Sequence, residues 1–203
     1  MNIAILGTGT VGTALATKLV ELGHDVTFGS RTPQDTSALP APALSHAQAV
    51  ASADLVINAT PGGLALELLN SIGADALDGK VLLDVSNAVG PDMNLIYPND
   101  SVARLIQEAF PAVKVVKSLN TFNTSVMTNP GALSAQTTVY VSGNDADAKA
   151  TVTKLLADLG WPASAVLDLG GIETARAVEH YFYLFFATML ATQTPTFNIA
   201  VTR

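Results

Sequence analysis

Short apolar runs rich in β-branched residues alternate along most of this chain with longer segments of helical periodicity. Runs that are apolar on both faces are typical of parallel strands, because helices cover each face of a parallel sheet. The pattern therefore predicts an α/β fold with a doubly wound parallel sheet over residues 1–119. The expected strands cover residues 3–6, 25–30, 54–60, 80–86 and 113–119, and the expected helices cover 10–22, 47–51, 64–72 and 101–110.

The alternation becomes less regular after residue 119, which indicates a second unit over residues 120–203. We expect a smaller α/β unit here, followed by a long helix at 173–192 and a short strand at 198–201. The smaller unit comprises a strand at 137–143, a helix at 145–159 and a strand at 165–170. Connections longer than about 12 residues are uncommon in compact domains, so three of them are candidate binding loops. They are residues 32–44, 87–100 and 120–136.

Three glycines directly follow the first expected strand and open the first expected helix, in the segment ILGTGTVG. At this place Gly7 allows a tight turn, Gly9 lets the backbone approach a pyrophosphate, and Gly12 lets helix and strand pack closely. The helix N-terminus then directs its unpaired amide groups at the phosphates. A structural turn without a ligand is the alternative, but the position of the motif favours a dinucleotide bound to a Rossmann domain.

The residues after the second expected strand indicate which dinucleotide binds. An Asp or Glu about 20 residues after the glycines would bond the adenine ribose hydroxyls of NAD. This chain has Ser30, Arg31 and Thr32 there, so a guanidinium and two hydroxyls can receive a 2′-phosphate. The arrangement favours NADP(H) over NAD(H), while a solvated loop charge is the alternative reading of Arg31.

Small and polar residues follow the next three expected strands. Thr60 and Pro61 follow the third strand, Asn87 follows the fourth, and Asn120 and Thr121 follow the fifth. Ligands of open α/β sheets lie beyond the carboxyl ends of the strands, so we expect these residues near the nicotinamide. Asn120 and Thr121 are the candidate positioning groups. Ordinary turn chemistry is the alternative for any one of them.

The chain offers few groups for proton transfer. His24, His46 and His180 are isolated from one another in the sequence, and Asp84 lies within an apolar strand, where we expect it to pair with a backbone group. No Ser/His/Asp grouping, metal-ligand spacing or P-loop is present in the sequence. We therefore predict neither a metal nor a catalytic acid or base. Hydride transfer between two redox rings suits such a site, because it mainly requires that the rings lie face to face.

Composition narrows the partners and the compartment. The net charge of −7, without a basic block, disfavours nucleic acid and anionic membranes. The chain has no cysteine and no basic leader before its first strand, so we expect a cytoplasmic protein. The apolar run at 181–191 is shorter than the roughly 20 residues that span a bilayer. A homodimer through the helix at 173–192 and burial of that helix in the same chain are both open.

Several segments resemble the family of NADPH-dependent F420 reductases (F420H2:NADP oxidoreductases). They are LGTGTVGTALATKLVELGHDVTFGSR, INATPGG, LLDVSNAV, VVKSLNTFN and YVSGNDADAKATVTKLLADLGW, and the resemblance runs from Met1 to about Arg203. It implies reversible hydride transfer between NADPH and the deazaflavin F420. Scattered cations such as Lys117 and Arg203 are candidates for the anionic groups of F420.

The resemblance also implies roles for particular positions. The pyrophosphate would contact Thr8, Gly9, Thr10 and Val11, and the 2′-phosphate would contact Ser30, Arg31 and Thr32. The nicotinamide would lie between Thr60, Pro61, Asn87 and Asn120, and the F420 ring would stack near Asn120, Thr121, Phe122 and Phe197. Reduction of a flavin, a quinone or a ferric chelate is the alternative enzymatic function. A non-catalytic NADPH-binding regulatory module is the alternative outside enzymes.

Replacing the candidate 2′-phosphate ligand tests the cofactor assignment. We expect Arg31→Ala to weaken NADPH binding by about 1.5–3 kcal/mol, the usual contribution of a hydrogen bond to a charged group. NADH binding should change little, because NADH has no 2′-phosphate. Titration calorimetry with both cofactors measures the difference, and equal losses for the two would contradict the assignment.

Overall fold

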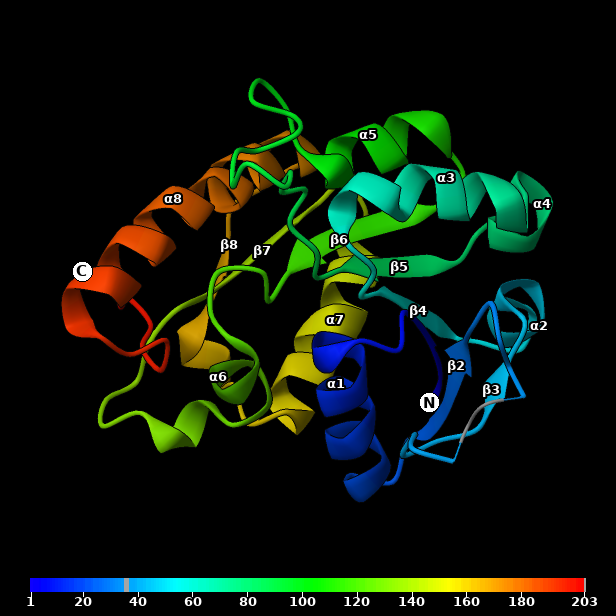
Figure 1. The fold of residues 1–203 in the computed structure, drawn as a ribbon, viewed down its shortest axis with the longest axis horizontal. Coiled ribbons are helices and arrows are strands. Elements are labelled where there is room, and N and C mark those ends of the chain that lie inside the picture. Colours follow the sequence, from blue (N-terminus) through cyan, green and yellow to red (C-terminus); the bar gives the residue numbers. More distant parts are fainter. Residues whose placement is uncertain (35–36, 203) are drawn as a thin grey trace.

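The computed structural model describes residues 1–34 and 37–202, in which eight strands form one sheet (Figure 1). The strand order is β3-β2-β1-β4-β5-β6-β7-β8, and every neighbouring pair is parallel except the antiparallel pair of β6 and β7. This confirms the predicted doubly wound α/β fold. The strands are β1 (Asn2–Leu6), β2 (Asp25–Gly29), β3 (Ala43–Leu44), β4 (Leu55–Asn58), β5 (Val81–Asp84), β6 (Lys114–Ser118), β7 (Val139–Gly143) and β8 (Val166–Asp168).

Helices cover both faces of the sheet (Figure 1). One face carries α1 (Thr10–Glu21), α6 (Thr124–Thr128) and α7 (Ala146–Asp158). The other face carries α2 (His46–Ala51), α3 (Gly62–Ile72), α4 (Ala74–Leu77) and α5 (Val102–Ala109). The long helix α8 (Ala175–Thr192) follows β8 and runs away from the sheet toward the C-terminus. Single turns of 3₁₀-helix occur at η1 (Pro130–Ala132), η2 (Ala163–Ala165) and η3 (Ile172–Thr174).

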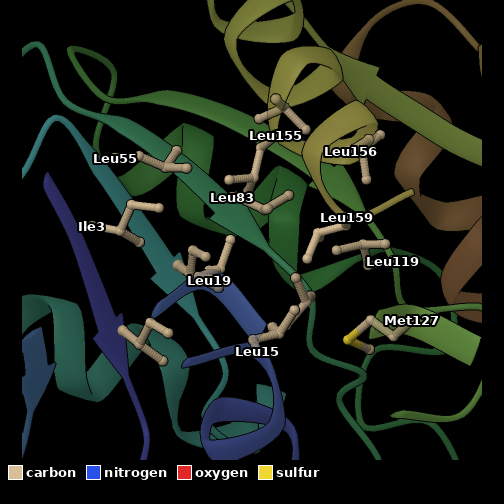
Figure 2. Close-up of a cluster of buried hydrophobic side chains, with 14 of the residues drawn as sticks. Ile3, Leu15, Leu19, Leu55, Leu83, Leu119, Met127, Leu155, Leu156 and Leu159 are labelled. Carbon is tan, nitrogen blue, oxygen red and sulfur yellow. The ribbon is translucent and has the colours of Figure 1, made fainter. Parts of the chain in front are cut away.

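The alternating strand residues supply two separate cores. In β1, Ile3 and Ile5 face α1 and α7, whereas Ala4 and Leu6 face the opposite layer. Figure 2 shows the first core, in which leucines of α1 and α7 meet strand residues such as Leu83. Strands buried on both faces have this pattern because a side chain points to each face in turn.

The strands of the expected smaller unit continue the main sheet, because β7 pairs with β6 and the sheet continues across residue 119. One expectation for the C-terminal region differs from the structure. The short strand expected at 198–201 is wrong, since those residues form no strand. Hydrogen bonds attach this segment to the chain before β7: Thr138 N donates to Ile199 O at 3.0 Å, Asn198 Nδ2 donates to Thr138 O at 2.9 Å, and Val201 N donates to Thr138 Oγ1 at 2.9 Å.

Truncation of a core leucine tests the packing of α7 on the sheet. Leu155 is fully buried, so Leu155→Ala should lower the free energy of unfolding by about 2–5 kcal/mol, from lost burial and the cavity left behind. Leu64→Ala, at an exposed helical position, is the control and should change it by less than about 0.5 kcal/mol. Urea denaturation measures both variants, and similar losses in the two would contradict the packing described.

Candidate active site

A cavity of about 460 Å³ opens at the carboxyl edge of the sheet. Ligands of open α/β sheets bind at this edge, near the point where the strand order reverses, which here lies between β1 and β4. Eight of the predicted site residues line the cavity: Gly9, Thr10, Val11, Thr60, Pro61, Asn87, Asn120 and Phe122. The other lining residues are Ala59, Val85, Ser86, Asn123, Thr124, Met127, Phe182, Phe185 and Phe186.

The glycine turn between β1 and α1 is packed so closely against neighbouring backbone that two of its glycines have no room for a Cβ atom. Gly7 has a φ of +113°, and a Cβ added to it would lie 2.7 Å from the carbonyl oxygen of Ala59. A Cβ on Gly12 would lie 2.0 Å from the carbonyl oxygen of Gly7, so helix and turn could not approach as they do. A Cβ on Gly9 would have no neighbour within 4 Å among the described residues. Gly7 and Gly12 therefore serve packing, and Gly9 presents open backbone to the cavity.

The first turn of α1 can bind an anion. Gly9 is its N-cap residue, and no side chain of the described residues caps this end of the helix. The amide groups of Thr10 and Val11 belong to this turn, and both residues line the cavity. Uncapped amides and the helix dipole together favour a phosphate at this position. Contact of Thr8 through Val11 with a pyrophosphate stays a prediction.

The predicted 2′-phosphate ligands follow β2, one strand away from the glycine turn. Ser30 Oγ accepts a hydrogen bond from Thr32 N at 3.0 Å, which shapes this loop, and Arg31 is exposed. The half-buried His46 lies near Arg31 at the start of α2. Burial and the positive charge of Arg31 both hold the pKa of His46 below its ordinary value. Arg31 thus supplies a positive charge where the phosphate is expected.

The predicted nicotinamide residues meet across the ends of β4, β5 and β6. The Asn87 amide donates to Asn120 O at 2.9 Å, and the Asn120 amide donates to Asn87 Oδ1 at 2.9 Å. A second hydrogen bond joins Asn120 Nδ2 to Val178 O of α8 at 3.0 Å. Both N–H groups of the Asn120 amide are thereby used, which leaves Oδ1 as the amide atom that can meet a ligand. Thr121 is buried and does not line the cavity, so it differs from Asn120 in access.

Four phenylalanines supply the apolar side of the cavity. Phe122 stacks on Trp161 with ring centroids 4.8 Å apart. The other three phenylalanines lie on α8, and we call them the aromatic wall: Phe182, Phe185 and Phe186. Phe197 does not line the cavity but stacks on Phe185 at 5.0 Å. Sequence analysis missed the aromatic wall, although its i, i+3, i+4 spacing places the three rings on one helix face. A planar ring system can stack against such a surface.

Three buried charged residues lie behind the cavity, and we call them the charged triad. Lys117 of β6 is fully buried, and its Nζ lies 2.7 Å from Asp84 Oδ2 of β5 and 3.0 Å from Glu179 Oε1 of α8. Nζ also donates to Ser86 O. Lys117 is therefore unavailable to an anionic ligand, which corrects the expectation for this residue, and Arg203 lies outside the described residues. Asp84 accepts from Ser86 N, as predicted, but the ammonium is its main partner.

The protonation of the triad follows from its burial. Burial opposes the charge on Lys117, but attraction to Asp84 and Glu179 outweighs it and raises the pKa of Lys117. Burial raises the pKa of Glu179 above its ordinary value, and the nearby Asp84 charge adds to the rise, while Lys117 opposes it. The ammonium is thus held charged beside the two carboxylates, and the raised pKa of Glu179 lets it take up a proton at a higher pH than an ordinary Glu would.

The cavity itself contains no ionisable side chain among the residues that line it. His24 lies 3.3 Å from Asp158, and the two ring nitrogens of His180 lie 2.8 Å from Arg176 O and Pro98 O. Within residues 1–34 and 37–202, no group of three or more His, Cys, Asp or Glu forms a metal site. The same residues contain no helix with the length and apolarity to cross a membrane. The geometry suits chemistry that requires placement of a ligand rather than proton transfer from a side chain.

The distal half of α8 is largely uncovered. Tyr183, Leu184 and Leu190 are exposed, whereas the buried residues of this helix are Ala175, Val178 and Glu179 in its first turns. The helix at 173–192 is therefore not an internal core element along its whole length. A homodimer through it stays a prediction.

The fold and the cavity define a Rossmann-type α/β protein with a crevice at the switch point of its sheet. The sequence model of the family "NADP oxidoreductase coenzyme F420-dependent" matches residues 2–88. A crystal structure of a protein from Arthrobacter sp. FB24, provisionally assigned as an F420-dependent NADP reductase, is 42% identical and covers 100% of both chains with a TM-score of 0.93. The chain belongs to this family of NADP oxidoreductases, which confirms the resemblance seen in its sequence.

Two further comparisons extend the range of relatives. Metalloreductase STEAP3 of Rattus norvegicus is 32% identical over 182 residues, which is 88% of this chain and 36% of the relative. The chain thus spans about a third of the length of the curated relatives it matches. A reductive aminase from Aspergillus terreus shares the fold, with 21% identity, a TM-score of 0.68, and coverage of 95% of this chain and 62% of the aminase.

The pKa of His46 provides a test of the 2′-phosphate position. We expect NADP⁺ to raise the pKa of His46, because the bound phosphate would offset the charge of Arg31. NAD⁺ should leave this pKa near its value in the free protein. Titration of the imidazole signals by NMR measures both, with Arg31→Ala as the control in which the difference between the cofactors should disappear. Equal shifts with the two cofactors would place the phosphate elsewhere.

Proposed function

We propose that the protein transfers hydride between NADPH and the deazaflavin F420. The observation that carries the proposal is an uncharged cavity at the switch point of the sheet, with amide groups on one side and phenylalanine rings on the other. Membership of the NADP oxidoreductase family supports the nicotinamide cofactor. The name given to the 42% identical Arthrobacter protein supports F420 as the second substrate.

The cavity residues fit such a reaction through placement. NADPH supplies a hydride to the oxidised acceptor, which also takes up a proton from water, so that NADP⁺ and the reduced acceptor result. Asn120 Oδ1 is placed to accept a hydrogen bond from an amide or ring N–H of a ligand. The aromatic wall would hold the acceptor ring flat and exclude water, which favours direct transfer between two stacked rings.

Reduction of a ferric chelate is the second candidate function. Its support is the 32% identity to the STEAP3 metalloreductase over 88% of this chain. The chelate would be a substrate here, and two ferric ions would take up the two electrons of one NADPH, with NADP⁺ and one proton released. A flavin or a quinone would use the aromatic wall in the same way as F420. We propose a small redox molecule as the partner in each case, and not a nucleic acid or a membrane.

Anaerobic single-turnover mixing distinguishes these acceptors. The protein with bound NADPH is mixed in parallel with oxidised F420, FMN, a quinone and ferric citrate, and the nicotinamide absorbance is followed. We expect F420 to oxidise NADPH at least about 10²-fold faster than the others, since a well-placed acceptor gains most from orientation. Faster oxidation by ferric citrate, FMN or the quinone would overturn the F420 proposal, and tight NADPH binding without oxidation would favour a regulatory module.

A further inference from the structure

The charged triad connects the two sides of the cavity. The Lys117 ammonium has three N–H donors, and its three acceptors come from different places: Asp84 on β5, Ser86 after β5, and Glu179 on α8. Ser86 lines the cavity next to Asn87. Lys117 is thus bonded both to the strand ends that form the nicotinamide side and to the helix that carries the aromatic wall.

The strand side of the triad extends to the cavity rim. Asp84 Oδ1 accepts from Ser86 Oγ at 2.7 Å and from Asn58 Nδ2 at 2.8 Å. Asn58 Oδ1 in turn accepts from Thr60 Oγ1 at 2.6 Å, and Thr60 lines the cavity. A continuous hydrogen-bond network therefore joins Lys117 to the residues after β4 and after β5. Movement of the ammonium would be transmitted to both.

The helix side of the triad determines how α8 is rotated. Glu179, Phe182 and Phe186 are spaced i, i+3, i+7, which places them on one helix face. Phe182 begins about 4.5 Å along the helix axis from Glu179, at 1.5 Å per residue. Glu179 Oε2 also accepts from Val102 N at 3.1 Å in the first turn of α5. Bonds to β6 and α5 therefore fix the carboxylate at one end of the face that carries the aromatic wall.

Stability does not account for this arrangement. A buried ion pair costs desolvation that its attraction often fails to recover, and apolar replacements of equal volume are commonly neutral or stabilising. The triad holds two carboxylates and one ammonium in a fully buried position. Its geometric consequence is a fixed separation between the strand ends and α8.

We propose that Lys117 is a positioning residue which, through Asp84, Ser86 and Glu179, sets the distance between the nicotinamide side of the cavity and the aromatic wall. The expected effect of Lys117 on hydride transfer rests on the proposed function. Its effect on the distance between the strand ends and α8 does not. Lys117 touches no ligand, since it has no exposed surface. Its effect is exerted through the residues that line the cavity.

Variants at the triad test the proposal by hydride transfer. Lys117→Met should slow the single-turnover oxidation of NADPH by about 10²-fold, the usual cost of a 1 Å misplacement, while the Kd for NADPH changes less than about 3-fold. NADPH binding should persist because the glycine turn and Arg31 lie outside the network. Lys149→Met is the matched control, because Lys149 pairs with Asp168 at 2.8 Å between α7 and β8, away from the cavity. It should leave the transfer rate unchanged.

A second variant covers the case in which Lys117→Met fails to fold with two unpaired carboxylates. The triple change Asp84→Asn, Lys117→Met and Glu179→Gln removes all three charges at similar volume. It should fold and still show the slow transfer, because methionine has no N–H group to donate to Ser86 O or to the side chain at position 179 of α8. Transfer at the wild-type rate in this variant would overturn the positioning role.

Hydrogen–deuterium exchange tests the structural part of the proposal in the absence of any acceptor. The triad variants should exchange faster than wild type in both segments 86–88 and 180–187, and Lys149→Met should not. Faster exchange spread evenly over the chain would show a general stabilising role and overturn the proposal. If wild type transfers hydride to no acceptor, the proposed function fails, whereas the exchange result still decides whether the triad joins the two segments.

Discussion

The architecture of the crevice depends on the contact between Gly12 and the carbonyl group of Gly7. A Cβ at residue 12 would lie 2.0 Å from that oxygen, so the helix can begin directly at the end of β1 only because the side chain is absent. The same turn brings Gly7 against Ala59, which follows the neighbouring strand β4. The amide groups at the start of α1 are thereby placed at the reversal of strand order, where the cavity opens. Any larger residue at Gly12 would displace the helix end from the strand ends that complete the site.

The core of the fold was predictable because the doubly wound part has a strong local signal. Strands buried on both faces are continuous apolar runs, and the helices between them have a different period, so each element could be recognised from its own residues. The pairing of β7 and β8 with the main sheet could not be predicted in this way. A run such as TTVYVSG indicates a strand, but it indicates neither the neighbouring strand nor the direction of pairing. The terminal segment at 198–201 failed for a related reason. This segment meets the chain before β7 through one backbone–backbone hydrogen bond, from Thr138 N, and through bonds of the Asn198 and Thr138 side chains, rather than through a ladder.

The candidate site also has a part that could be predicted from local sequence patterns and a part that could not. Thr60, Asn87 and Asn120 could be placed together because parallel strands end at one edge, and all three line the cavity. The position of the aromatic wall beside these residues could not be predicted, because α8 is far from β6 in the sequence and no local pattern shows that the two pack together. Two signals were nevertheless present in the sequence: the spacing of the three phenylalanines on one helix face, and Lys117, the second of two lysines in the run VKVVKSL. An unpaired ammonium is too costly to bury, so that lysine required buried carboxylates, and Asp84 and Glu179 provide them.

The aromatic wall has to be held in place by something other than burial. Phe182, Phe185 and Phe186 are only half-buried, and the opposite face of the helix exposes Tyr183 and Leu184, so hydrophobic packing alone does not fix its rotation. Polar contacts in the first turns do so instead, through Glu179 on Lys117, His180 on Pro98 O and the Tyr183 hydroxyl on Leu95 N. The His180 and Tyr183 contacts attach α8 to the connection at 87–100, whose first residue, Asn87, lines the cavity. Directional hydrogen bonds specify a single orientation of the helix, whereas apolar contacts are compatible with several. Hydride transfer between two stacked rings requires a single orientation, because the rings have to be held in a fixed geometry.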